Sequence, residues 1–114
     1  MIRLGVLLVL AAAALASAAG ADTPTLQGSV GPAFTISLTD SSGSAVTHLD
    51  PGAYGVHVVD QGDIHDFHLV GPGVNKKTGI AFKGTVTWTV TLRAGKYAFR
   101  SDAHRALHGT LTVS

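Results

Sequence analysis

A strict alternation of threonine with apolar residues limits the fold of this chain more than any other feature. Between Thr85 and Leu92 every odd-numbered position is threonine, and Val86, Trp88 and Val90 lie between them. Successive side chains of a β-strand point to opposite faces of a sheet, so this period of two predicts a strand with one buried apolar face. A helix would scatter the same apolar residues around its circumference. The segment therefore predicts a sheet whose second face meets water.

Further short strands are predicted on both sides of this segment. Apolar and polar residues alternate again from residue 34, and clusters of glycine, proline, aspartate and serine separate the strands at short intervals. The predicted strands cover residues 34–39, 54–59, 64–70, 85–92, 97–100 and 109–113. The predicted loops include residues 71–73 and 75–79. About seven or eight strands at this spacing, with no helical period in the domain, predict one all-β domain, an antiparallel Greek-key β-sandwich.

Charge and cysteine content exclude several classes of function. Lys and Arg total 8 and Asp and Glu total 7, and the totals are equal once Arg3 of the N-terminal segment is set aside. Such an even balance predicts neither nucleic-acid binding nor attachment to an anionic membrane. The chain has no cysteine, so its core must stabilise the fold without disulfides. A domain of this size buries roughly 60% of the surface of its unfolded chain, which suffices for one core.

The N-terminal residues have the pattern of a secretory signal peptide. A positively charged start precedes the apolar run 4–16, which is shorter than a membrane-spanning helix. Small residues follow, and cleavage is predicted after Ala18 or after Ala21. An uncleaved membrane anchor is the alternative. We take residues 1–21 as the signal peptide and residues 22–114 as the domain, which predicts a secreted, periplasmic or cell-envelope protein with no membrane span after cleavage.

Two stretches of the domain resemble the secreted bacterial plastocyanin- and azurin-type cupredoxins. The first runs from His65 to Val74 (HDFHLVGPGV), and the second runs from Tyr97 to Val113 (YAFRSDAHRALHGTLTV). In that family the second stretch reads Y-x-F-x-C-x-x-H-x-x-M-x-G-x-x-x-V. Together with the threonine-rich strand between the two stretches, the resemblance covers most of the domain. It implies a cupredoxin-like Greek-key β-sandwich with a copper site formed by the two stretches.

The resemblance implies four copper-ligand positions, and two of them carry different chemistry here. His65 and His104 fall on the two histidine positions of the family. Ser101 stands at the position of the cysteine ligand, and Leu107 stands at that of the methionine. Asp66 replaces an asparagine whose side chain usually ties the two ligand loops together in the family. His65 and His104 are therefore expected side by side, either as metal ligands or as packing and hydrogen-bonding residues.

Loss of the thiolate changes the copper chemistry that the resemblance implies. A blue copper site requires two imidazoles and a thiolate, with a weak axial thioether. The Ser101 hydroxyl stays protonated at ordinary pH and is at best a weak neutral ligand, and Leu107 offers no donor atom. Copper(I) loses both soft sulfur ligands, whereas copper(II) accepts nitrogen and oxygen donors. The sequence therefore predicts a colourless or pale histidine-based copper site and argues against type 1 electron transfer.

Three further residues are candidates to complete such a site. His108 follows the lost methionine position, and the carboxylates of Asp102 and Asp66 suit copper(II) or zinc. For two of these residues a role without metal is the alternative. His108 would then be an exposed side chain, and Asp102 would be a turn residue that hydrogen-bonds to its own backbone. His68 lies three positions after His65, so strand alternation predicts that it points to the opposite face.

An enzymatic function is not predicted. Ser101, His104 and an aspartate supply the residue types of a hydrolase triad, but the chain has no G-x-S-x-G motif. His48 and His57 have no spacing that indicates a site. Two hypotheses result from the sequence. The first is an exported copper-binding domain with His65 and His104 as ligands, and the second is a metal-free β-sandwich that serves as a structural module or binds a protein partner.

Overall fold

The computed structural model describes residues 23–114 of the chain. The predicted signal peptide and both predicted cleavage sites lie outside the described residues. The described part contains nine strands and no helix, so it holds no helix able to cross a membrane. The strands are β1 (Thr25–Val30), β2 (Ile36–Thr39), β3 (His48–Leu49), β4 (Gly52–Asp60), β5 (His68–Gly71), β6 (Val74–Lys77), β7 (Gly84–Leu92), β8 (Gly95–Arg100) and β9 (His108–Val113).

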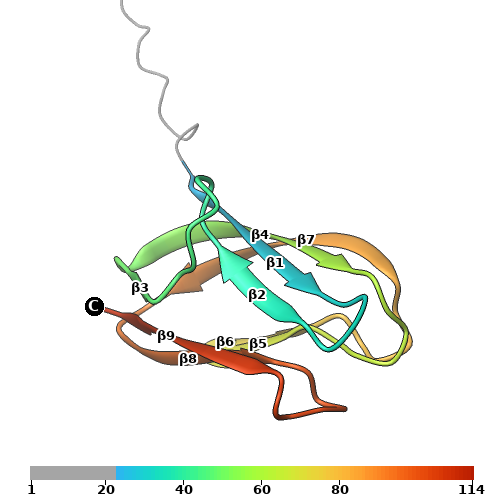
Figure 1. The fold of residues 1–114 in the computed structure, drawn as a ribbon. Coiled ribbons are helices and arrows are strands. Elements are labelled where there is room, and N and C mark those ends of the chain that lie inside the picture. Colours follow the sequence, from blue (N-terminus) through green and yellow to red (C-terminus); the bar gives the residue numbers. More distant parts are fainter. Residues whose placement is uncertain (1–22) are drawn as a thin grey trace, which may run out of the picture.

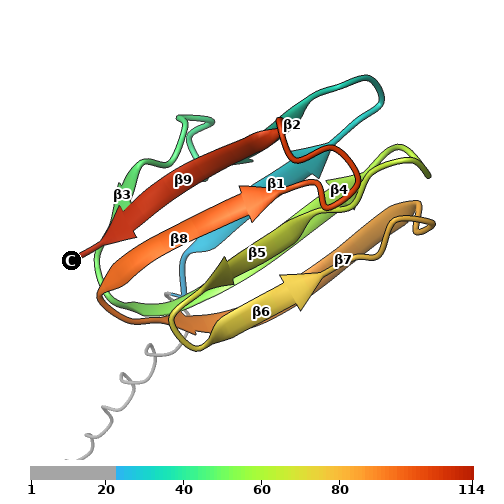
Figure 2. The same ribbon diagram turned by 90° about the horizontal axis from the view of Figure 1, so that it is seen from below.

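The strands form two sheets that pack face to face (Figure 1). One sheet has the order β2-β1-β4-β7, and the other has the order β3-β9-β8-β5-β6. Figure 2 shows β9, β8, β5 and β6 side by side. The predicted all-β sandwich is thereby confirmed. Its sheets are mixed and not purely antiparallel as predicted, because β1 pairs with β4 and β3 pairs with β9 in parallel. Residue alternation identifies the faces of a strand but carries no information on the direction of its neighbours.

The threonine-rich strand β7 has the two faces that its alternation predicts. Its threonines are exposed, whereas Val90 and Leu92 are buried and Trp88 packs against the core. Between the sheets, Phe67 is fully buried and its ring stacks on that of Phe99, with ring centroids 5.9 Å apart. The Phe67 ring also lies 6.4 Å from the Trp88 ring. Because Trp88 belongs to β7 and Phe99 to β8, these aromatic contacts join the two sheets.

A buried tyrosine ties two loops to β8. The Tyr97 hydroxyl accepts a hydrogen bond from the Arg93 amide at 3.0 Å. The same hydroxyl can donate its hydrogen to the Arg93 carbonyl at 2.9 Å or to the Pro72 carbonyl at 3.1 Å. Gly71 lies directly against the Tyr97 ring, because a β-carbon added at position 71 would lie 2.6 Å from Cγ of the tyrosine. Glycine is the residue that leaves room for the buried ring at this point.

The structure corrects several details of the predicted strands. Residues 74–77 form β6, although a loop was predicted over residues 75–79, and the strand predicted from residue 64 begins only at His68. The short strand β3 and the first strand β1 have no counterpart in the prediction. Phe34 was predicted on the buried face of a strand, yet it precedes β2 and is 62% exposed. Residues 75–77 of the edge strand β6 are all exposed, so its sequence carries no alternation to detect.

The pairing of β5 with β8 brings the two stretches that resemble cupredoxins together. β5 begins at His68 and β8 ends at Arg100, and these two residues are partners in the antiparallel register. The residues just before β5 therefore lie beside the residues just after β8. This is the end of the sandwich where the β4–β5 and β8–β9 loops meet, and it carries the candidate site.

Candidate metal centre

His65 lies in the β4–β5 loop and is fully buried. Its Nδ1 atom is 3.0 Å from Nδ1 of His104 and 3.3 Å from Oγ of Ser101. The other ring nitrogen, Nε2, is buried and has no hydrogen-bond partner among the described residues. A buried polar atom is ordinarily hydrogen-bonded, and Nε2 of His65 is an exception. The position of this ring is therefore set by packing and by the contacts of its Nδ1 atom with His104 and Ser101.

A chain of partly buried hydrogen bonds holds the segment around His65. Asp60, the last residue of β4, accepts hydrogen bonds from the Gly62 amide at 3.2 Å and from the Thr78 hydroxyl at 3.1 Å. That hydroxyl in turn accepts a hydrogen bond from the Phe67 amide at 3.0 Å. Burial raises the pKa of Asp60, and these hydrogen bonds partly oppose the rise. The network fixes the backbone on both sides of His65.

The β8–β9 loop folds into a compact turn that places His104 over Ser101. Ser101 follows β8 directly, is fully buried, and donates its amide hydrogen to the Leu107 carbonyl at 3.0 Å. The Leu107 amide donates to the His104 carbonyl at 2.9 Å, and the His104 amide donates to the Ser101 hydroxyl at 3.2 Å. The side chain that replaces the family's cysteine therefore organises the loop and faces both histidines.

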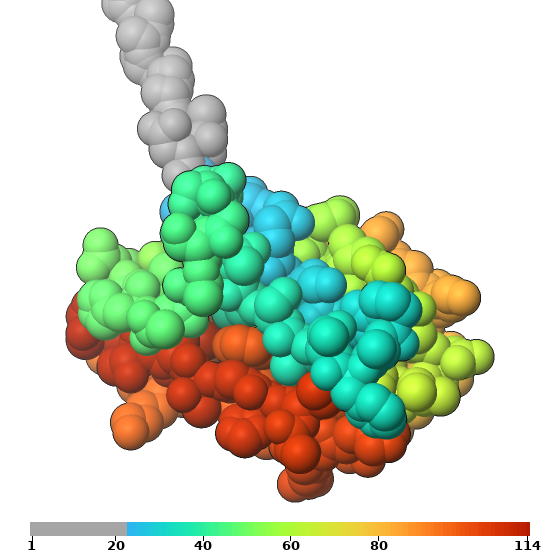
Figure 3. Space-filling view, viewed as in Figure 1, coloured from blue at the N-terminus to red at the C-terminus, as the bar shows by residue number. Residues whose placement is uncertain are grey.

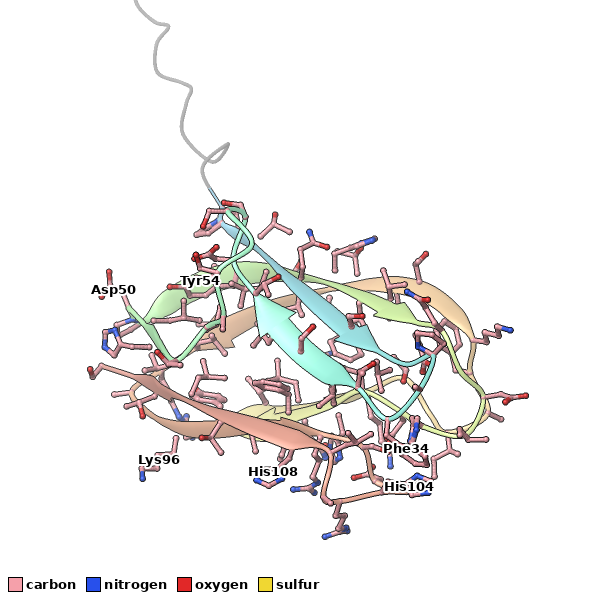
Figure 4. All side chains as sticks on the ribbon, viewed as in Figure 1. Phe34, Asp50, Tyr54, Lys96, His104 and His108 are labelled. Atoms are coloured by element: carbon pink, nitrogen blue, oxygen red, sulfur yellow. The ribbon has the colours of Figure 1, made fainter. Side chains whose placement is uncertain are left out.

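The two Nδ1 atoms of His65 and His104 are close enough to share one hydrogen or to bind one cation between them. Each neutral imidazole has one donor and one acceptor nitrogen, and two Nδ1 atoms 3.0 Å apart form a hydrogen bond when one is protonated and the other is not. The rings of His65 and His104 meet edge to face, with centroids 4.6 Å apart. Phe34, from the β1–β2 loop, contacts both rings in the same manner, and Figure 4 shows it beside His104.

A second polar network lies next to this pair. Oδ1 of the buried Asp66 accepts a hydrogen bond from the Asp102 amide at 2.6 Å. Oδ1 of Asp102 lies 2.9 Å from Nδ1 of His68 and accepts a hydrogen bond from Nε of Arg100 at 3.2 Å. The other ring nitrogen of His68 lies 2.6 Å from Oδ1 of Asn75. Asp66 therefore ties the segment that carries His65 to the β8–β9 loop.

The two carboxyl groups of this network have opposite pKa shifts. Burial raises the pKa of Asp66, and the hydrogen bond from the Asp102 amide only partly opposes that rise. Burial acts in the same direction on Asp102, but hydrogen bonds, chiefly that with His68, outweigh it and lower the pKa of Asp102 to about 2. Donor atoms of Asp66, His68 and Asp102 all lie within 4.8 Å of one another. Both ring nitrogens of His68 are already bonded to protein groups, so this cluster has no free imidazole donor.

Solved structures with a similar fold include rusticyanins and an amicyanin. Reduced rusticyanin matches with a TM-score of 0.58 and 18% sequence identity over 79% of this chain and 78% of that chain. Rusticyanin from Thiobacillus ferrooxidans matches with a TM-score of 0.54 and 21% identity over 79% and 76% of the two chains. A proline-to-alanine variant of oxidised amicyanin matches with a TM-score of 0.52 and 16% identity over 79% and 82%. The fold is that of the cupredoxins. No family model and no curated protein matches the sequence.

The cupredoxin fold brings together three of the five residues that were predicted from the sequence as metal ligands. His65, Ser101 and His104 lie in mutual contact. His108 is the exposed first residue of β9, and Figure 4 shows it apart from His104. The carboxylate of Asp102 is engaged with the second network described above.

The remaining histidines lie elsewhere, and one residue at the pair had no signal in the sequence. His57 hydrogen-bonds to Thr87 across β4 and β7, and His48 hydrogen-bonds to Ser114. Sequence reasoning missed the contact of Phe34 with the two imidazoles. The alternation from residue 34 onward pointed this side chain inward, and no motif marks it.

The residues present fit a metal ion that accepts nitrogen and oxygen donors. An imidazole nitrogen binds an ion such as zinc at about 2.0–2.1 Å, so two nitrogens 3.0 Å apart can both reach one ion. The Ser101 hydroxyl, 3.3 Å from Nδ1 of His65, lies on the same side of the ring. The donor set of two imidazoles and a neutral hydroxyl suits copper(II) or zinc and lacks the sulfur that copper(I) prefers.

Proposed function

We propose that this chain is an exported cupredoxin-like domain that binds copper(II) through His65 and His104, with Ser101 as a weak neutral donor. The observation that supports it most is the 3.0 Å separation of the two Nδ1 atoms, which converge from separate loops. Rusticyanin, a structural neighbour, is described as a copper protein. A fold alone does not determine function, so the proposal depends on the convergence of these donors.

The proposed role is copper binding or handling and not blue-copper electron transfer. A copper(II) ion bound here would supply a redox-active centre with nitrogen and oxygen ligands and without a thiolate. The chain's own part is to hold the two imidazoles at a fixed separation. The β4–β5 network fixes His65, and the compact β8–β9 turn fixes His104. Export rests on the N-terminal residues, which have the pattern of a signal peptide.

We also propose that the domain is not an enzyme. Ser101 is fully buried, and its hydroxyl is engaged with the His104 amide and the His65 ring. A serine nucleophile has to reach a substrate carbonyl with a pair of oxyanion donors nearby. Neither requirement has support among the described residues around Ser101.

Calorimetric titration of the purified protein with copper(II), combined with electron paramagnetic resonance, tests the metal-binding proposal. We expect one saturable site with a nitrogen-rich spectrum and no intense blue absorption. His104→Ala should abolish this binding, and because His104 is exposed, its removal leaves the core intact. His57→Ala, a histidine bonded only to Thr87, is the matched control and should bind as the wild type does.

The same titration reports on the remaining ligand candidate and on the alternative function. If His108→Ala also loses copper, the β8–β9 loop rearranges on binding to recruit that side chain. If the wild type shows no saturable binding at micromolar copper, the paired histidines serve packing and hydrogen bonding. The chain would then be a metal-free β-sandwich module, for which a protein partner should be sought.

A further inference from the structure

Phe34 combines high exposure with specific contacts to the candidate site. It belongs to the loop between β1 and β2, and 62% of its surface is exposed. Two hydrogen bonds close this loop, from the Gly31 amide to the Thr35 carbonyl at 2.9 Å and from the Thr35 hydroxyl to the Gly31 carbonyl at 3.0 Å. The ring is therefore presented from a compact loop and not from a long flexible segment.

The Phe34 ring lies against both imidazoles of the pair. Its centroid is 5.1 Å from that of His65, at an interplanar angle of 68°, and 5.0 Å from that of His104, at an angle of 80°. Both values are within the range of favourable edge-to-face aromatic contacts. The three rings thus form one cluster, which we call the aromatic triplet. In Figure 3 the β1–β2 loop, in teal, lies against the red β8–β9 loop.

The triplet joins loops from both sheets of the sandwich. β1 and β2 belong to one sheet, whereas β5, β8 and β9, which flank the two histidines, belong to the other. Ile64, next to His65 in the chain, is 49% exposed, yet His65 itself is fully buried. A side chain that arrives from the opposite sheet and contacts the His65 ring accounts for part of this burial.

We propose that Phe34 is a shielding residue that denies water and small anionic ligands access to His65, the buried member of the pair. An apolar group beside a donor pair controls solvent entry and the local dielectric. With the sulfur ligands absent, a metal held by two imidazoles and a hydroxyl would accept further ligands from solution wherever it is open. The Phe34 ring closes the side that faces the β1–β2 loop. The effect on bound metal rests on the proposed copper function, whereas the shielding of His65 does not.

A metal-free experiment tests the shielding itself. The purified protein is treated with diethyl pyrocarbonate at limiting dose, and the modification of each histidine is followed by mass spectrometry. In the wild type, His65 should remain unmodified while the exposed His108 reacts. In Phe34→Ala, His65 should become reactive, with the rate at His108 unchanged. Persistent protection of His65 in Phe34→Ala would overturn the proposal.

Two further variants separate shielding from general loosening of the fold. Phe82→Ala removes another phenylalanine, one that packs beside Gly84, and should leave His65 protected. Phe34→Leu keeps an apolar side chain of similar reach and should protect His65 better than Phe34→Ala. If Phe82→Ala exposes His65 as strongly as Phe34→Ala does, the protection reflects overall stability and the specific role of Phe34 is rejected.

A second experiment applies the same variants to the copper(II)-loaded protein, with azide as the probe ligand. Azide should shift the electron paramagnetic resonance spectrum of Phe34→Ala at a lower concentration than that of the wild type. Equal responses to azide in both proteins would overturn the role of Phe34 toward bound metal. Failure of the wild type to bind copper would instead reject the proposed function, and the modification experiment would still decide the shielding of His65.

Discussion

Replacement of Asp66 tests how the two ligand loops are held together. Its Oδ1 atom accepts the Asp102 amide hydrogen at 2.6 Å, and the residue is 1% exposed. Asp66→Ala removes the acceptor and leaves the amide without its partner. An unsatisfied buried donor costs about 1–3 kcal/mol, so we expect a loss of about 2 kcal/mol in the free energy of unfolding. For a domain of this size, that loss lowers the melting temperature by roughly 8–16 °C.

Asp66→Asn should have the opposite effect at neutral pH. The asparagine oxygen can accept the same amide hydrogen, and its side chain carries no charge. Burial raises the pKa of Asp66, so the folded state holds this proton more tightly than the unfolded state does. As the pH rises above the ordinary value of 3.8, stability therefore falls until the folded-state pKa is passed. At pH 7 the wild type therefore carries a penalty for this buried carboxyl that Asp66→Asn does not carry.

Thermal unfolding followed by circular dichroism at pH 7 and at pH 3 measures both effects. At pH 7 the order of melting temperatures should be Asp66→Asn, then wild type, then Asp66→Ala. At pH 3 the advantage of Asp66→Asn over the wild type should shrink, because the carboxyl is then protonated in both states. Equal melting of the two variants would refute the role of the amide hydrogen bond. If Asp66→Asn keeps its full gain in melting temperature at pH 3, the buried charge of Asp66 is not the cause of that gain.

Three further predictions concern the metal site, the packing and the acid stability. Ser101→Cys combined with Leu107→Met should produce an intense blue absorption on addition of copper(II), and a folded, copper-loaded but colourless variant would contradict the alignment of the ligand loop. Gly71→Ala should destabilise the fold by about 3 kcal/mol in urea denaturation, because its β-carbon would overlap the buried ring of Tyr97; unchanged stability would show that the ring can move aside. The pKa of Asp102 is lowered to about 2, so stability should fall as the pH drops from about 4 to about 2, and Asp102→Asn should flatten that part of a pH series of melting temperatures.

Strands could be predicted where apolar and polar side chains alternate along the sequence. The strand β6, at the edge of its sheet, could not be predicted in this way. The half-buried face of β7 follows from its threonines, because burial imposes period two on a strand with one face in water. β6 has three exposed polar residues in succession, and its strand conformation comes from pairing with β5. Such pairing is a property of the neighbour and leaves no mark on the sequence of the strand.

The candidate site could be predicted only as far as the cupredoxin resemblance carried it. The motif spacing placed Ser101 and His104 together, and the HDF segment placed His65 with them. The position of Asp66 suggested a tie between the loops, and its bond to the Asp102 amide provides one. Phe34 belongs to a loop of the other sheet, and its distance along the chain hid the contact.

The order of strands within the sheets has a consequence for how the domain assembles. β9 is the last of the described strands along the chain, yet it lies inside its sheet between β3 and β8. Until β9 has docked, β8 lacks one neighbour, and Leu111 and Val113 are missing from the core. The parallel pairing of β9 with β3 joins segments far apart along the chain, and such pairings form slowly during folding.

The loop that carries His104 is closed only when β8 and β9 pair, with Arg100 opposite His108. A chain emerging residue by residue therefore cannot present the two imidazoles at their final separation before β9 is available. Copper that reaches an incomplete chain would meet separate histidines and not the preformed pair. Acquisition of metal at this site would thus follow folding and would not guide it.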